Sequence, residues 1–300
     1  MTNTSQHLAP PSRPAATFEE ALARIKALQA LDGPEVREDS HTRFWSQGEQ
    51  VEHALVYYHG YTNAPPQFNI LGEKLCDQGF NVLVPRLPYH GLKDPLTTEQ
   101  SKLTAEAMAA LTQETVDIAR GLGKRVTIAG LSGGGVMAAW AAQFRADVDH
   151  TVVISPAFGF PFVPAWISSA ARFSLLHLPN FFIWWDPRVK EKIVGPPHAY
   201  PRFSTKGLAE TFRLGTVVRK AANSTKPAAA HIQMVLSEFD AAIHLPTARK
   251  VAEEWKQHGA DVAVYEFAKD LKIWHDMIDP QQSTQQIDVV YPVILPMLLK

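Results

Sequence analysis

The 300-residue chain contains little cysteine and no clear excess of charge of either sign. Its one cysteine, Cys76, cannot form an internal disulfide and excludes a cysteine-based metal cluster, which fits a reducing compartment. The 29 basic and 30 acidic residues leave a formal net charge of -1. A nearly neutral chain has no general electrostatic attraction for nucleic acid or for an anionic membrane. We therefore expect binding to depend on a defined site, with no nucleic-acid partner.

Long apolar runs are also missing. The most apolar late stretch, 289–299, is too short to span a bilayer and contains Pro292 and Pro296, so it predicts a final helix covering a sheet. The first residues lack the basic and apolar regions of a signal peptide, and a cytoplasmic location is expected. No motif has metal-ligand spacing, and neither a metal nor another cofactor is expected. The sequence does not indicate an oligomeric state.

The chain has enough apolar material for a large core, because 46% of its residues are hydrophobic. Residues 1–16 are rich in Pro, Ser, Thr and Ala and predict a flexible N-terminal arm. Residues 17–300 are expected to form a single domain. A capping box of Thr17 and Glu20 predicts its first helix.

Apolar strands alternate with helices through most of the remaining chain. An antiparallel hairpin is expected around a turn at Gly48 and Glu49, and a long helix from about 98 to 122. Strands separated by helices predict an α/β fold, with a mostly parallel central sheet flanked by helices. The alternation is interrupted at about 158–206, where 11 of the 29 aromatic residues lie between Phe158 and Phe203. This segment is interpreted as an inserted cap.

Residues 124–144 predict a buried strand, a glycine-rich turn and an apolar helix. The turn contains Gly130, Ser132 and Gly134 in the pattern G-x-S-x-G, which is typical of a nucleophile elbow. Glycine suits both flanking positions, because strand and helix pass close to each other in such a sharp turn. An inert glycine-rich turn is the alternative interpretation of this pattern.

A serine hydroxyl needs a histidine to accept its proton and a carboxylate to orient that histidine. Loops that follow parallel strands gather at one edge of a sheet, which limits the candidates. Asp240 follows a late strand and is the preferred acid, with Glu238 second. His275 follows the last predicted strand and is the preferred base. The order Ser132, Asp240, His275 is that of α/β-hydrolases.

Two backbone N–H groups are expected to form the oxyanion hole, those of Gly133 and Tyr61. The residues expected to line the substrate pocket are His59, Leu131, Phe158, Trp166, Trp184 and Trp185. Of these, His59 is expected to brace the loop that carries Tyr61 rather than to transfer protons. His90 is a further histidine near this loop, for which a structural role is preferred.

The segments HGYTNAPPQF, GLSGGG, SEFDAAI and IWHDMI, in this order, resemble the α/β-hydrolase superfamily, especially its capped serine carboxylesterases and monoacylglycerol lipases. The resemblance covers about residues 40–300. It implies Ser132, Asp240 and His275 as a catalytic triad, and Tyr61 and Gly133 as oxyanion donors. The sequence of the predicted cap matches no known substrate class.

The expected function is hydrolysis of small carboxylic esters with an apolar acyl group, through an acyl-enzyme. The aromatic segment favours an apolar substrate, since Trp and Phe supply large apolar surfaces. Alternatives are a lipase or lysophospholipase, a thioesterase and, with less support, a peptidase or a carbon–carbon hydrolase. A non-catalytic protein that binds an apolar ligand is the alternative from a different class.

Overall fold

The computed structural model describes residues 8–159, 179–189 and 195–300 of the chain. Seven strands form the central sheet in the order β1-β3-β2-β4-β5-β8-β9, and all neighbours are parallel except β1 and β3. The strands of this sheet are β1 (Arg43–Trp45), β2 (Val51–Tyr58), β3 (Asn81–Val84), β4 (Gly123–Leu131), β5 (His150–Ile154), β8 (His231–Ser237) and β9 (Asp261–Phe267).

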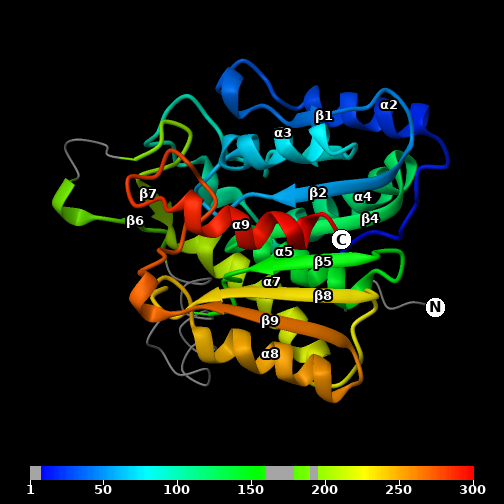
Figure 1. The fold of residues 1–300 in the computed structure, drawn as a ribbon. Coiled ribbons are helices and arrows are strands. Elements are labelled where there is room, and N and C mark those ends of the chain that lie inside the picture. The colour runs from blue at the N-terminus through cyan, green and yellow to red at the C-terminus, as the bar shows by residue number, and fades with distance from the viewer. Residues whose placement is uncertain (1–7, 160–178, 190–194) are drawn as a thin grey trace.

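Helices cover both faces of the sheet (Figure 1). The α-helices are α2 (Phe18–Gln29), α3 (Asn69–Asp77), α4 (Ala105–Leu122), α5 (Gly133–Phe144), α7 (Thr205–Ala222), α8 (Leu245–Gln257) and α9 (Ile287–Leu298). Short 3-10 turns are η1 (Glu38–Ser40), η2 (Pro65–Phe68), η3 (Glu99–Lys102), η4 (Pro187–Val189) and η5 (Lys269–Leu271). Mostly parallel strands covered by helices on both faces confirm the predicted α/β fold with a mostly parallel central sheet.

Strand β2 shows how the sheet divides the core into two clusters. Leu55 and Tyr57 belong to the cluster that also contains residues of α3 and α9. Ala54, Val56 and Tyr58 point to the opposite face, in the cluster that contains residues of α2, α4, α5, α7 and α8. Successive side chains of a strand alternate between faces, so an unbroken apolar run fits a strand that is buried on both sides.

The predicted hairpin around Gly48 is wrong. Strand β1 pairs with β3 instead of β2, in antiparallel register from Arg43 opposite Val84 to Trp45 opposite Val82. The ring of Trp45 packs against Gly72 of α3, and a methyl group at Gly72 would lie 2.7 Å from that ring. This contact requires β1 to lie beside β3, on the outer edge of the sheet.

The predicted helix over 98–122 is divided into η3 and α4. Thr104 is the N-cap residue of α4, and its side-chain oxygen accepts the Ala107 N–H at 3.1 Å. A side chain that caps a helix start defines a new N-terminus, so the two segments are separate.

The predicted arm, 1–16, lies partly outside the described residues. Within the described part, the Ser12 hydroxyl donates to Asp117 of α4 at 2.7 Å, and the Arg13 N–H donates to the same carboxylate at 2.6 Å. The Ala15 N–H also donates to the Asp117 carbonyl, at 2.9 Å. Residues 12–15 are therefore fixed on the outside of α4.

Two further strands lie apart from the central sheet, within the segment predicted to be a cap. β6 (Phe182–Trp184) and β7 (Arg202–Ser204) pair in antiparallel register. We call the described residues 179–189 and 195–204 the ribbon. It lies beyond the carboxyl ends of the central strands (Figure 1). The predicted cap boundaries stay a prediction, since 160–178 and 190–194 lie outside the described residues.

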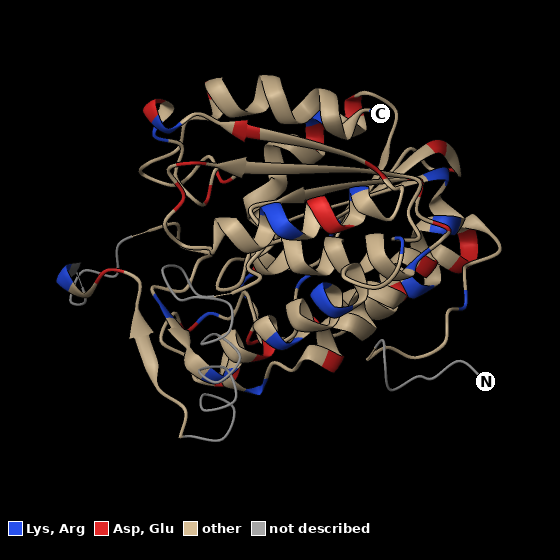
Figure 2. Ribbon diagram, turned by 90° about the horizontal axis from the view of Figure 1, so that it is seen from below, with Lys and Arg blue, Asp and Glu red and all other residues tan. Residues whose placement is uncertain are grey.

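Charged residues of both signs are mixed over the helices and loops (Figure 2). Among the described helices, none combines the length and the apolar character that crossing a membrane requires.

Candidate functional site at the carboxyl ends of the strands

Ser132 lies between β4 and α5 in a backbone conformation that side chains rarely adopt, with φ 60° and ψ -113°. A methyl group at Gly130 would lie 2.2 Å from the Gly134 carbonyl oxygen, and one at Gly134 would lie 1.9 Å from the Tyr58 carbonyl oxygen. Neither position can accept a side chain without movement of the backbone. The close packing of β4, α5 and β2 thus explains the spacing of the glycines around Ser132.

Backbone hydrogen bonds connect the Ser132 turn to the loops after the neighbouring strands. The Ser132 N–H donates to the Ile154 carbonyl at the end of β5, at 3.0 Å. The Ser155 N–H in turn donates to the Val235 carbonyl of β8 at 2.8 Å, and the Glu238 N–H donates to the Phe267 carbonyl of β9 at 3.0 Å. The loops that carry Ser132, Asp240 and His275 therefore lie along one edge of the sheet.

Asp240 and His275 form the closest pair of predicted triad residues. The Nδ1 atom of His275 lies 2.7 Å from Oδ2 of Asp240, whose side chain is fully buried, whereas the His275 side chain is 23% exposed. The second Asp240 oxygen accepts the Ala242 N–H at 2.8 Å. With Asp240 ionised, Nδ1 carries the proton, and Nε2 of the neutral ring is left with a lone pair that can accept a proton.

The two side chains shift each other's pKa. Burial lowers the pKa of His275, but the charge and the hydrogen bond of Asp240 outweigh it, so the pKa of His275 is raised. Burial raises the pKa of Asp240, but His275 and the Ala242 N–H outweigh it, so the pKa of Asp240 is lowered. The pair therefore favours a charged imidazolium beside an ionised carboxylate.

Glu238, the second predicted acid, and Asp186 of the ribbon are engaged elsewhere. Glu238 accepts the Lys269 N–H at 3.1 Å, and Asp186 forms an ion pair with Arg188 at 2.8 Å. Among hydrogen bonds between described residues, none joins the Ser132 hydroxyl to His275. Catalytic hydrogen bonds are often long in free enzymes and tighten with bound substrate, and the pairing of Ser132 with His275 stays a prediction.

The predicted oxyanion donors lie close to each other. A methyl group at Gly133 would lie 3.2 Å from the backbone nitrogen of Tyr61. Within the described part of the chain, neither of the two N–H groups donates a hydrogen bond. Tyr61 lies in a four-residue turn, 60–63, which the Asn63 N–H closes by donating to the Gly60 carbonyl at 3.0 Å. We call this segment the oxyanion turn.

The histidines near the oxyanion turn have structural contacts. His59 is fully buried; its Nε2 accepts the Leu87 N–H at 3.0 Å, and its Nδ1 lies 2.9 Å from the Gly60 carbonyl. Both ring nitrogens are occupied, and burial lowers its pKa well below the ordinary value. His90 is also fully buried, and burial lowers its pKa to about 4. Both rings are thus neutral, and the His90 ring packs edge-on against the Tyr61 ring of the turn, with ring centres 5.5 Å apart.

The other predicted pocket residues occupy different environments. Leu131 and Phe158 are each 1% exposed and belong to the core clusters. Trp184 is half-buried on β6, whereas Trp185 is 51% exposed. Trp166 lies outside the described residues. An acyl pocket formed by these residues stays a prediction.

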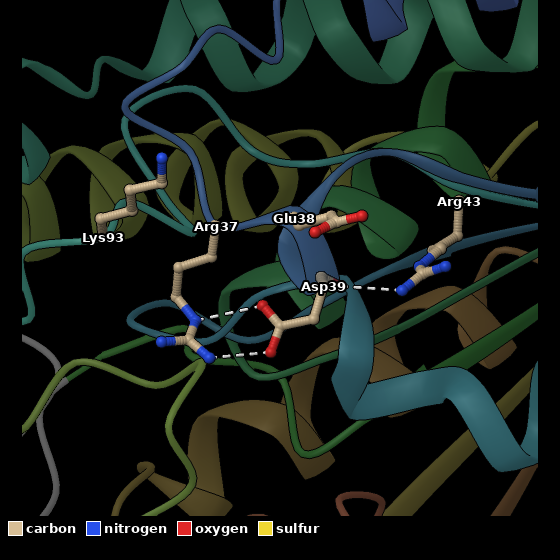
Figure 3. Close-up of a pocket in the computed structure, with 5 residues that line it drawn as sticks. All are labelled: Arg37, Glu38, Asp39, Arg43 and Lys93. Atoms are coloured by element: carbon tan, nitrogen blue, oxygen red, sulfur yellow. Dashed lines mark hydrogen bonds and ion pairs between the residues drawn. The ribbon is translucent and has the colours of Figure 1, made fainter.

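A cavity of about 570 Å³ lies elsewhere, between η1, β1 and the loop after β3 (Figure 3). Its lining is charged and includes the ion pair of Arg37 with Asp39 at 2.9 Å. Sites for apolar ligands are lined mainly by apolar and aromatic side chains, so this cavity does not suit an acyl chain. Within the described ranges, no group of three His, Cys, Asp or Glu side chains could hold a metal ion.

Sequence reasoning missed a polar network behind the oxyanion turn. Asp276, adjacent to His275, accepts hydrogen bonds from the side chains of Asn63, Gln67 and Gln282 at 2.8–2.9 Å. Asp279 accepts from Nε2 of the buried His198, at 2.8 Å. In the sequence, this network could have been inferred from polar residues such as Gln67 and Asp276, which lie beside apolar residues. Polar side chains that become buried need hydrogen-bond partners.

Comparisons with known proteins agree with this architecture. The model of the alpha/beta hydrolase family matches residues 55–277. No curated protein sequence matches the chain. Among solved structures, the monoacylglycerol lipase of Paleococcus ferrophilus is 19% identical, with a TM-score of 0.64 over 86% of this chain and 98% of the lipase.

Two other solved structures show similar agreement. A structure reported for LipS and LipT, two metagenome-derived lipolytic enzymes, is 18% identical. Its TM-score is 0.63 over 87% of this chain and 96% of that chain. Est1E of Butyrivibrio proteoclasticus, solved with ferulic acid, is 18% identical, with a TM-score of 0.58 over 86% of this chain and 94% of Est1E. At these identities the likeness is evidence for the fold.

Proposed function

Because the chain belongs to the alpha/beta hydrolase family, we propose that it hydrolyses carboxylic esters with Ser132 as the nucleophile. The observation that carries this proposal is the arrangement at one edge of the sheet. At this edge, Ser132 lies in the elbow with φ 60°, and Oδ2 of the buried Asp240 lies 2.7 Å from Nδ1 of His275.

In the proposed reaction, the Ser132 hydroxyl attacks the ester carbonyl while Nε2 of His275 takes its proton. Asp240 stabilises the imidazolium that forms, and the N–H groups of Tyr61 and Gly133 stabilise the oxyanion. The imidazolium then protonates the leaving alcohol, which departs and leaves an acyl group on Ser132. A water molecule, deprotonated by His275, attacks this acyl-enzyme; the acid is released, and the proton returns to Ser132.

The test compares the wild-type chain with Ser132→Ala on a series of p-nitrophenyl esters of increasing acyl length. We expect kcat to fall by about 10³-fold or more in the variant, since the nucleophile is lost. A fluorophosphonate probe should label the wild-type chain at Ser132 and leave the variant unlabelled. Hydrolysis that persists in Ser132→Ala, with no labelling of the wild-type Ser132, would eliminate the proposal.

A lipase that acts at a lipid surface is the second candidate. It is favoured by three exposed apolar side chains on one stretch of the ribbon: Phe181, Ile183 and Trp185 are 56%, 49% and 51% exposed. Exposed apolar residues that cluster on a surface favour contact with another apolar surface. A marked rise in activity as an ester passes from the dissolved to the micellar state supports this candidate, and a preference for dissolved short esters supports an ordinary esterase.

A further inference from the structure

Asp276 is linked by hydrogen bonds to both ends of the oxyanion turn, although it lies more than 200 residues later in the chain. Its Oδ2 accepts from Nδ2 of Asn63, the last residue of the turn, at 2.9 Å. Its Oδ1 accepts from Nε2 of Gln67 at 2.9 Å. The Oε1 atom of Gln67 accepts the N–H of Gly60, the first residue of the turn, at 2.9 Å. The carboxylate thus holds one end of the turn directly and the other through Gln67.

Gln67 is a rigid connection between the two segments. It is 1% exposed, and its Oε1 also accepts the Tyr57 hydroxyl at 3.0 Å, so both ends of its amide are hydrogen bonded. A buried amide with all these partners keeps one orientation, because rotation would leave buried polar atoms unpaired. The position of Gly60 is therefore coupled to the position of Asp276.

The reacting groups lie next to the residues that the network holds. Tyr61, the proposed oxyanion donor, lies inside the turn, and His275, the proposed base, directly precedes Asp276. We propose that Asp276 is a positioning residue, which fixes the oxyanion turn relative to the catalytic histidine through Asn63 and Gln67. This inference rests on the proposed ester hydrolysis and adds a carboxylate, separate from Asp240, that serves the same site.

The charge of Asp276 provides a second readout. The titratable groups around its carboxylate are His275 and Asp279 of its own loop, Tyr57 of β2 and Tyr291 of α9, and His198 bonds to Asp279. Burial and the neighbouring Asp279 raise the pKa of Asp276 to about 6, and Asp276 itself helps to raise the pKa of His275. Removal of its charge should lower the pKa of His275.

The experiment uses the full chain and a dissolved p-nitrophenyl ester, with Ser132→Ala measured in parallel. We expect Asp276→Asn to lower kcat about tenfold or more with KM within about twofold, because misplaced catalytic groups lose rate more than ground-state binding. The acid limb of its kcat/KM profile should move to lower pH. The shift of this limb reports the loss of the Asp276 charge beside His275, which a change in fold stability alone would not produce.

Two matched variants each remove one amide donor to Asp276. Gln67→Met also breaks the link to Gly60, and we expect kcat to fall about tenfold. Gln282→Met leaves the turn untouched, and kcat should stay within about twofold of the wild type. Thermal unfolding of each variant shows whether it is folded. If Asp276→Asn does not fold, the comparison of Gln67→Met with Gln282→Met tests the positioning role.

The outcomes separate the two proposals. If the wild type and Ser132→Ala are equally inactive, the proposed function fails. If the wild type is active through Ser132, but Asp276→Asn keeps the wild-type kcat, the positioning role is wrong, whether or not the acid limb moves. Equal kcat values for Gln67→Met and Gln282→Met would overturn it as well.

Discussion

The Ser132 turn and the ribbon lie at the same end of the molecule but are held in different ways. Around Ser132, the backbones of β2, β4 and α5 approach so closely that Gly130 and Gly134 leave no space for a methyl group. The ribbon has exposed apolar side chains, and one of its links to the oxyanion turn is the Trp185 Nε1–H donating to the Thr62 hydroxyl at 3.0 Å.

This comparison separates two kinds of requirement. The turn depends on steric exclusion, in which almost every substitution at a flanking glycine forces the backbone to move. The exposed stretch of the ribbon, 181–185, depends on individual hydrogen bonds and on partly exposed contacts, each of which contributes about 1 kcal/mol. Changes in the first region should therefore have larger effects than changes in the second.

The largest expected effect follows from Gly134→Ala. Its methyl group would lie 1.9 Å from the Tyr58 carbonyl oxygen, so β2 and α5 must separate. We expect a loss of more than about 4 kcal/mol in the free energy of unfolding, or no folded protein. Denaturant unfolding measures this change. Gly259→Ala is the matched control, since Gly259 has φ 79° but no atom near the added methyl group, and it should cost only about 1 kcal/mol. Equal losses would show that packing at the turn is not limiting.

Asp240→Asn should have the next largest effect, on rate rather than on folding. The amide cannot hold the imidazole in the same tautomer or stabilise its charge, so we expect kcat to fall about 10³- to 10⁴-fold. Steady-state kinetics with a dissolved ester measures the loss. Glu238→Gln is the control, because Glu238 contacts Lys269 rather than His275, and kcat should stay within about twofold.

The pH profile sharpens this prediction. His275 must be neutral to accept the serine proton, and Asp240 raises the pKa of His275 above its ordinary value. The kcat/KM of the wild type should therefore fall as pH decreases through a pKa above about 6.5. In Asp240→Asn the acid limb of the residual kcat/KM should shift to lower pH, because the pKa of His275 is no longer raised by the carboxylate. An unmoved limb would exclude His275 as the group that titrates.

The parts of the molecule that local rules determine could be predicted from the sequence. The alternation of strands and helices predicted the parallel sheet, and the glycines around Ser132 predicted the elbow between β4 and α5. The candidates Asp240 and His275 followed from loop positions after β8 and β9. The structure places these two side chains in contact, while their catalytic roles stay a prediction.

The parts that depend on distant partners could not be predicted. The position of β1 beside β3 depends on the contact of Trp45 with Gly72, which strand propensity does not reveal. The role of Gln67 depends on a carboxylate 209 residues later in the chain. Neither the hydrophobic period nor a short motif contains information about such a pair, since both describe only local neighbours.

The smallest expected effect tests the ribbon through Trp185→Phe. The variant loses the hydrogen bond to Thr62, while phenylalanine can still pack beside Phe203, whose ring centre lies 4.4 Å from that of Trp185. Because Trp185 is half-exposed, water replaces part of the lost bond, and we expect a loss below about 1 kcal/mol in unfolding free energy. Thr62 adjoins Tyr61 in the oxyanion turn, so kcat/KM for a dissolved ester should fall by about threefold or less.

Tyr265→Phe is the matched control for this small change, because it also removes a polar atom from a partly exposed aromatic residue, on β9. It should leave kcat/KM unchanged. If Trp185→Phe instead lowered kcat/KM as strongly as Asp240→Asn, the ribbon would be as essential to the site as the strand ends. A single exposed hydrogen bond could cause so large a loss only by controlling the position of Tyr61. The contrast between steric exclusion at the turn and weak individual contacts in the ribbon would then not hold.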